Sequence, residues 1–234
     1  MLDMIPDIVM DIFLALLTSY AFWYLTFIRS GTNILFSDHI VVEPCSNGHG
    51  YDQYRYRIKL VNAGIRDLIE VTSIVELLTQ PFSPEATTRR ISRLSLDNED
   101  FPILKGRKEQ KKSGRAASKV LDLYLTDSFF EEFSKEYYSD DIRKKAAARQ
   151  LTLTDIIQAH RDSVRITIYL YGNDSITGAR RMFSSEYGAS DIRHGTYAPT
   201  PTEHIGRVSA AKAGLKFIPQ SDADNPDCTM PAAE

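Results

Sequence analysis

Residues 51–62 read YDQYRYRIKLVN, and this stretch decides the fold class. Polar and apolar side chains alternate along it with a period of two, which is the pattern of a β-strand that buries one face. The predicted buried face carries Tyr54, Tyr56, Ile58 and Leu60, and the opposite face carries Arg55, Arg57 and Lys59. A turn at residues 62–64 and the apolar run LIEVTSIVELLT at 68–79 follow, so we expect two antiparallel strands in a half-buried sheet.

Other stretches of the chain also read as strands. They share short alternating or apolar runs and lie at residues 39–44, 90–96, 101–104, 120–126 and 164–172. The last is followed by the polar turn NDSITG at 173–178 and by ARRMFSSEY at 179–187, which is a hairpin pattern. Helical composition at 127–150 and 151–163 predicts one or two short helices. We therefore expect an all-β dominated protein.

The N-terminus carries an apolar run. Residues 12–28, IFLALLTSYAFWYLTFI, contain no charge, and residues 8–10 extend the run to roughly the 20 residues that a bilayer requires. Acidic residues precede it and no small-residue cleavage site follows, so we predict an uncleaved transmembrane anchor at 1–29. Lys and Arg occur only after the run, and the positive-inside rule then predicts a single-pass membrane protein with its N-terminus outside and its C-terminal domain in the cytoplasm. A buried core helix is the alternative.

The length of 234 residues suits one domain with extensions. We expect a connector at 30–39, a domain at 40–198 and a flexible tail at 199–234, which is rich in Pro, Asp, Ala and Thr. With 28 basic and 31 acidic residues the net charge is -3, so nothing indicates nucleic acid as a partner. Cys45 and Cys228 lie far apart, and the second falls in the polar tail, which argues against a disulfide framework.

Four stretches within this region resemble the cytoplasmic, C-terminal domain of inward-rectifier potassium channels. They are YRIKLVNAGIRDLIEVTSIVELLT at 56–79, FPIL at 101–104, VLDLYLTDS at 120–128 and YLYGNDSITGARRMFSSEYGASDIRHGTYAP at 169–199. Positions typical of the family's late hairpin are occupied by Thr177, Gly178, Tyr187, Asp191, Ile192, Gly195 and Tyr197. The resemblance covers about residues 40–198.

This resemblance implies an Ig-like (E-set) β-sandwich at the inner membrane face, preceded by a single transmembrane helix. In the channel family such a domain assembles around a ring and transmits ligand or lipid signals to the membrane helices. A potassium pore needs two membrane helices around a re-entrant loop with a Thr-x-Gly-Tyr-Gly filter. The sequence has one apolar segment and no such filter, so we expect that the chain is not a pore by itself.

One segment between strands is strongly basic. It contains one acidic residue, Glu109, and six basic residues within eleven positions. The basic residues are Lys105, Arg107, Lys108, Lys111, Lys112 and Arg115. Basic clusters near a membrane helix bind anionic lipid with about 1 kcal/mol per charge. We therefore predict that this segment contacts anionic lipid, and the alternative is a solvated loop.

The residues indicate no catalytic, cofactor or metal site. Cys45 and His49 are four positions apart, but a zinc site needs four ligands, or three and a water, and the other histidines are scattered. Nucleophile-elbow and phosphate-binding glycine motifs do not occur in the sequence. The aromatic face of the helix at 129–138 is expected to pack against the sheet, with a partner surface as the alternative. We predict no enzyme activity and no cofactor.

Taken together, these features predict a membrane-anchored, non-enzymatic binding, sensing or assembly module. The partners that we expect are the lipid bilayer and a protein, either a different chain or further copies of this one. An accessory or regulatory subunit of an ion channel or transporter is the second hypothesis. A membrane-anchored enzyme whose site is assembled only by the fold is the third, and no residue pattern supports it.

Overall fold

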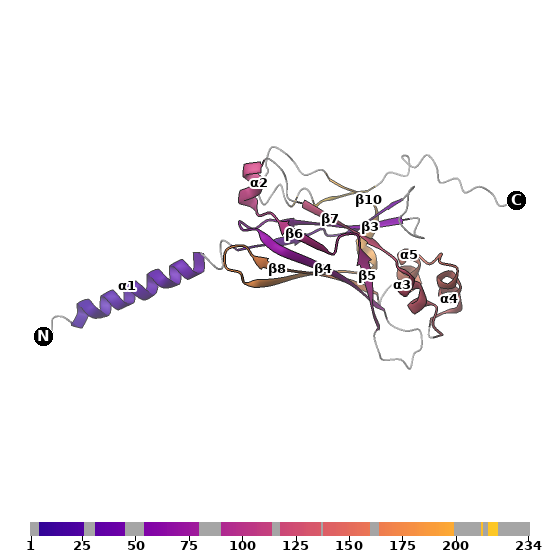
Figure 1. Cartoon of the computed structure of the whole chain (residues 1–234), viewed down its shortest axis with the longest axis horizontal. Helices are drawn as coiled ribbons and strands as arrows, with labels where there is room; N and C mark the ends of the chain where they lie inside the picture. The colour runs from indigo at the N-terminus through magenta and orange to yellow at the C-terminus, as the bar shows by residue number, and fades with distance from the viewer. Residues whose placement is uncertain are drawn as a thin grey trace.

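The structure is a computed structural model. It describes residues 5–25, 31–44, 54–79, 90–113, 118–136, 138–159, 164–198, 212 and 215–219. Within these ranges the protein is dominated by one curled sheet, with short helices at its ends (Figure 1).

Eleven strands form this sheet in the described part of the chain. They are β1 (Ile34–Phe36), β2 (Ile40–Pro44), β3 (Tyr54–Asn62), β4 (Leu68–Thr79), β5 (Arg90–Leu96), β6 (Asp100–Leu104), β7 (Ser118–Tyr124), β8 (Arg165–Asp174), β9 (Arg180–Tyr187), β10 (Ile192–Tyr197) and β11 (Phe217–Pro219). Their order is β11-β10-β2-β3-β7-β5-β4-β8-β9, with β1 paired to β3 and β6 paired to β4. The predicted strands and the β8–β9 hairpin are confirmed, and β1 and β11 lie in segments predicted as connector and tail.

The core lies on the concave side of the sheet. Burial alternates along β4 and β8, as a half-buried strand requires, and apolar side chains from β3, β4, β7 and β8 meet in one cluster. Ile58, Leu77, Leu121 and Ile168 are among its fully buried members. Each such side chain contributes roughly 1.5–3 kcal/mol relative to exposure, so these strands account for much of the stability.

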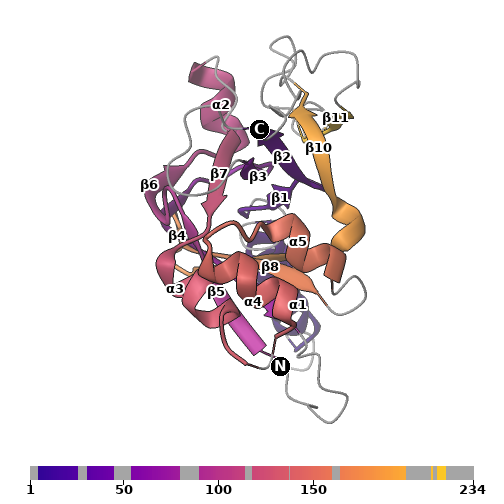
Figure 2. The same ribbon diagram turned by 90° about the vertical axis from the view of Figure 1, so that its right-hand side faces the viewer.

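The predicted Ig-like (E-set) β-sandwich is wrong. The sheet is a curled half-barrel, and its strands do not form two sheets packed face to face. The reason is visible at β5, which pairs with β4 through Val75↔Leu94 and with β7 through Leu96↔Leu123. Because β5 joins both neighbours, hydrogen bonding continues around the curve (Figures 1 and 2). Alternation specifies which face of a strand is buried, but it does not specify what covers that face.

Four short α-helices accompany the sheet: α2 (Arg107–Ser113), α3 (Asp127–Phe133), α4 (Asp140–Ala147) and α5 (Leu153–Ala159). The last three gather at one end of the half-barrel (Figure 2). The helix expected over 127–150 is divided, because Ser139 caps a new helix and accepts a hydrogen bond from the Ile142 N–H. Phe129, Phe130 and Phe133 are buried in the core, which confirms the predicted packing of the aromatic face.

The N-terminal helix α1 (Ile5–Trp23) extends away from the half-barrel (Figure 1). Its side chains from Val9 to Trp23 are exposed. It spans 19 residues and includes Asp7 and Asp11. No helix in the described ranges is long and apolar enough to cross a membrane. The transmembrane anchor predicted at 1–29, and the single-pass placement with the N-terminus outside, are therefore wrong.

Candidate functional site

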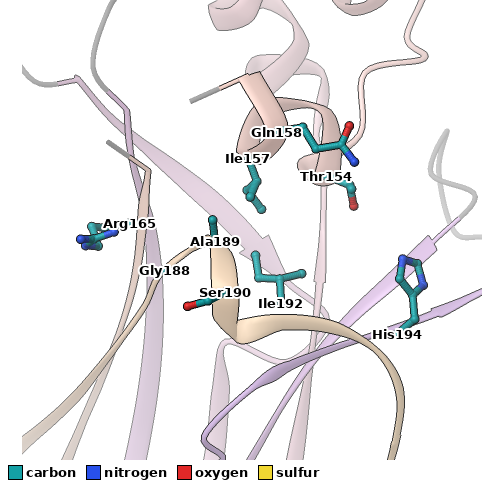
Figure 3. Close-up of a pocket in the computed structure, with 9 residues that line it drawn as sticks. All are labelled: Thr154, Ile157, Gln158, Arg165, Gly188, Ala189, Ser190, Ile192 and His194. Atoms are coloured by element: carbon teal, nitrogen blue, oxygen red, sulfur yellow. The ribbon is translucent and has the colours of Figure 1, made fainter. Parts of the chain in front are cut away.

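A pocket of about 660 Å³ opens between α5, the first residue of β8, a 3-10 turn at Ala189–Asp191 and β10 (Figure 3). The lining comes from three stretches of the chain, and in the third the 3-10 turn runs directly into β10. The lining residues are Thr154, Ile157, Gln158, Arg165, Gly188, Ala189, Ser190, Ile192 and His194.

The α5 wall is held in place by a reciprocal cap. The Thr152 N–H donates to Asp155 Oδ2 at 2.9 Å, and the Asp155 N–H donates to Thr152 Oγ1 at 3.1 Å. Lys145 of α4 also donates to Asp155 Oδ1 at 2.9 Å. Burial alone would raise the pKa of the Asp155 carboxyl, but the bonds from Lys145 and Thr152 outweigh burial and lower it. The ionised carboxylate therefore fixes the start of α5.

The middle of the pocket is apolar. Ile157 projects from α5 toward Ala189 and Ile192 (Figure 3). Ile157 is buried, whereas Ala189 and Ile192 are partly buried and pack against the core. We call these three apolar residues the floor of the pocket. Thr154 and Gln158 add polar groups beside the floor, because residues four positions apart share one face of α5.

Arg165 supplies a positive charge on the other side of the floor (Figure 3). Its Nε lies 3.1 Å from Glu186 Oε1, and its Nη1 donates to the Val164 carbonyl at 3.1 Å. A Cβ on Gly188 would lie 3.3 Å from this Nη1, so the small residue leaves room for the guanidinium. Within the part of the chain that the structure describes, no Asp or Glu side chain lines the pocket.

The 3-10 turn is stabilised by its own polar groups. The Gly188 N–H donates a 2.8 Å hydrogen bond to Asp191 Oδ2. The Ser190 hydroxyl donates a 3.2 Å hydrogen bond to Asp191 Oδ1. Arg193 Nε donates to the Ser190 carbonyl at 3.2 Å. Ser190 is thus paired with a carboxylate, while His194 packs edge-on against the Tyr54 ring with centroids 5.7 Å apart.

β10 carries Ile192 and His194 into the pocket wall and is anchored at its far end by Tyr197. β10 runs parallel to β2 only through Ile192↔Ile40, Arg193↔Val41 and His194↔Val42. Beyond this short ladder, the Tyr197 hydroxyl lies 2.9 Å from the His39 carbonyl and 3.0 Å from Ser37 Oγ. Burial raises the pKa of the Tyr197 phenol, so the hydroxyl stays protonated and keeps β10 in place.

The predicted basic segment lies elsewhere, at the end of the half-barrel away from α5 (Figure 1). It forms the helix α2, where a loop was expected, because buried Gln110 donates to the Asn62 carbonyl at 2.9 Å and the Lys105 carbonyl at 3.0 Å. Lys105, Lys108, Lys111 and Lys112 are exposed, and Lys112 pairs with Glu109. Arg107 is partly exposed. Arg115 lies outside the described residues, and the contact with anionic lipid stays a prediction.

Sequence reasoning missed the pocket. The residues that line it form no local sequence motif. The one signal near it is the capping pattern Thr152-x-x-Asp155, which indicates the start of the helix that supplies one wall. Cys45 and His49, weighed above as metal ligands, lie outside the described residues. Within the described ranges, no three His, Cys, Asp or Glu side chains come together as a metal site would require.

Comparisons with known proteins place the chain in no family. No family model matches it, and no curated protein matches it. A similar solved chain is the solution structure of a protein described as late embryogenesis abundant (LEA), which is 12% identical over 80% of this chain and 87% of that chain, with a TM-score of 0.27. A likeness at this level identifies no function. None of these comparisons bears on the resemblance to the inward-rectifier domain, which stays a prediction.

Proposed function

We propose that the protein is a non-enzymatic binding module whose pocket holds a small molecule with an apolar body and one anionic group, such as a carboxylate. The observation that carries the proposal is the charge of the pocket wall. The guanidinium of Arg165 lines it, and no acidic side chain of the described residues does. An anionic group entering the pocket meets the positive charge of Arg165, whose carboxylate partner Glu186 is outside the described lining.

The apolar floor of the pocket would contact the apolar body of the ligand. Ile157, Ala189 and Ile192 present a surface that gains from losing water, at roughly 25 cal/mol for each Å² buried. A pocket of about 660 Å³ falls within the range of about 300–1,000 Å³ that is usual for small-molecule sites. Thr154, Gln158 and Ser190 add hydrogen-bonding groups that orient a ligand.

The anionic end of the ligand would bind at Arg165. The Arg165 side chain is 44% exposed and already pairs with Glu186, which is 61% exposed. Exposed pairs of this kind contribute little stability, so the guanidinium can be shared with a ligand carboxylate at small cost. A planar guanidinium offers two parallel N–H donors to a carboxylate, which Lys cannot do.

The test compares hexanoate with its uncharged analogue hexanamide, using the full chain. Calorimetric titration and saturation-transfer difference NMR are expected to show tighter binding of hexanoate. Arg165→Gln is expected to weaken hexanoate binding at least tenfold and to leave hexanamide binding unchanged, because only the charge-assisted bonds are lost. Arg143→Gln on α4 is the matched control, since Arg143 forms a similar exposed pair 3.2 Å from Asp140.

Three results would contradict the proposal. One is that neither probe binds saturably, and another is that the two bind with equal affinity. The third is that Arg143→Gln weakens hexanoate as much as Arg165→Gln does, since the effect would then reflect total charge and not this pocket.

A further inference from the structure

β9 forms one end of the sheet. It spans eight residues and pairs with β8 from Asn173↔Arg180 to Ile166↔Tyr187. No described strand pairs with its other side, where the strand order ends. An edge strand of this length presents a row of backbone groups that a further strand can use.

The edge of β9 lacks the usual features that prevent such pairing. Proteins protect edge strands with charged side chains, Pro, bulges or short length. The centre of β9 is Met182, Phe183, Ser184 and Ser185, with no charge and no Pro, and Met182 is 61% exposed. Charges occur only toward the ends of the strand, at Arg180, Arg181 and Glu186.

The hairpin determines which backbone groups point outward. The Asp174 N–H donates to the Ala179 carbonyl at 3.0 Å, so these two residues form a hydrogen-bonded pair. Bonded and non-bonded pairs alternate along an antiparallel ladder, so Phe183 directs its backbone groups toward β8. Met182 and Ser184 therefore direct their N–H and C=O groups toward the open edge.

We propose that this edge binds the β9 strand of a second copy of the chain, antiparallel, with Phe183 opposite Phe183. This register places Arg180 of each copy directly opposite Glu186 of the other, on the exposed face of the sheet. The two Phe183 rings meet on the opposite face, where cross-strand aromatic pairs are favourable. The strand is thus complementary in charge to its own reversed copy.

The register follows from the positions of the charges. A two-fold axis between neighbouring antiparallel strands places one residue opposite its own copy. Centring the pair on Met182 moves Arg180 opposite Ser184, and centring it on Ser184 moves Arg180 opposite Gly188. Only the register centred on Phe183 pairs opposite charges, and it does so twice.

Sedimentation velocity of the full chain tests the proposal. We expect a dimer that Met182→Pro weakens at least tenfold. Pro removes an N–H that points to the open edge, so the β8–β9 ladder keeps its bonds and the monomer is expected to retain its circular dichroism spectrum. Ile103→Ala on β6, another exposed apolar position away from β9, is the control and is expected to leave the dimer intact.

Charge exchange gives a second variant that does not alter the backbone. Arg180→Glu alone is expected to weaken the dimer at least tenfold, because it places Glu opposite Glu186. Glu186→Arg is expected to do the same. Combining the two substitutions restores opposite charges across the axis and is expected to restore the dimer.

Cross-linking locates the axis. In a Cys45→Ser and Cys228→Ser background, Phe183→Cys is expected to form an intermolecular disulfide faster than Met182→Cys, because the non-hydrogen-bonded pair brings its Cβ atoms closest. A monomer at 100 µM would overturn the proposal. So would a dimer that neither Met182→Pro nor the single charge changes weaken, or one in which Phe183→Cys does not cross-link preferentially.

Discussion

The hydroxyl of Tyr197 donates a 2.7 Å hydrogen bond to the backbone carbonyl of Arg57. The bond joins β10 to β3 across the intervening strand β2. The same oxygen accepts from the Lys59 N–H at 3.2 Å, and the Lys59 ammonium lies 5.8 Å from the centre of the Tyr197 ring. One side chain therefore ties the strand that carries Ile192 and His194 to the centre of the sheet.

Tyr197→Phe is expected to destabilise the fold by about 1–3 kcal/mol, because it leaves buried backbone groups without their partner. Urea unfolding measures the change. Tyr169→Phe is the control, since the Tyr169 hydroxyl has no hydrogen bond to any described residue and its loss is expected to change stability by less than about 0.5 kcal/mol. Equal effects of the two substitutions would show that Tyr197 acts only through its ring.

We expect the fold to lose stability at alkaline pH because of Tyr187. Burial raises the pKa of its phenol to about 12, and its hydroxyl donates to the Ser37 carbonyl at 2.8 Å. A phenol whose pKa is raised by folding contributes stability that is complete below pH 10 and is lost as pH rises toward 12. The shift corresponds to about 3 kcal/mol across this window.

The measurement is the free energy of unfolding from pH 9 to 12. Tyr187→Phe is expected to be less stable at neutral pH but to lose less stability than the parent chain above pH 10. The same slope in both proteins would mean that Tyr187 does not titrate in this range.

We expect the fold to lose stability in acid because of Asp174. It is fully buried, and its Oδ1 lies 3.4 Å from Arg66 Nη1 and accepts from the N–H groups of Ile176 and Thr177. Burial alone would raise the pKa of the carboxyl, but these hydrogen bonds and the Arg66 charge outweigh burial and lower it. Stability from this group is therefore present above about pH 4 and is lost as pH falls further.

Asp174→Asn is expected to cost about 3–5 kcal/mol at pH 7, because it removes the buried carboxylate that pairs with the Arg66 guanidinium at 3.4 Å. Thermal and urea unfolding measure it. Asp140→Asn is the control, since Asp140 is 80% exposed and its pairing with Arg143 contributes less than about 1 kcal/mol. A cost at Asp174 no larger than this would show that the buried pair is not stabilising.

Gly106→Ala is expected to detach α2 from the sheet. A Cβ at this position would lie 2.5 Å from the carbonyl carbon and oxygen of Arg66, which are backbone atoms and cannot rotate away. The expected cost is about 1–3 kcal/mol, with faster amide exchange in α2. Gly178→Ala gives the comparison, because that site has open space but a φ of 67°. Its cost of about 1–2 kcal/mol would come from conformation and would leave α2 unchanged.

The basic segment predicts salt-dependent binding to anionic vesicles. Neutral replacements at Lys105, Arg107, Lys108, Lys111, Lys112 and Arg115 are expected to abolish cosedimentation with phosphatidylserine vesicles, since each charge contributes about 1 kcal/mol. Replacing six other surface cations is the control. Binding that is unaffected by either set, or equally affected by both, would remove the prediction.

The sequence by itself determined the strands, because alternation is a local property. The period of two at residues 54–62 and the hairpin at 164–187 predicted β3, β8 and β9, and the aromatic spacing at 129–133 predicted which face of α3 is buried. The prediction of a transmembrane anchor from the N-terminal apolar run was wrong. Apolar composition does not by itself establish a helix long and apolar enough to span a membrane.

Only the tertiary structure decided how the strands curve and where a ligand fits. The half-barrel depends on β5 pairing with both β4 and β7, which involves residues nearly thirty positions apart, Ser95 and Tyr124. The pocket likewise brings together Thr154, Arg165 and His194 from three elements. Neither feature has a local pattern, because long-range pairing depends on the combined shape and burial of all the strands.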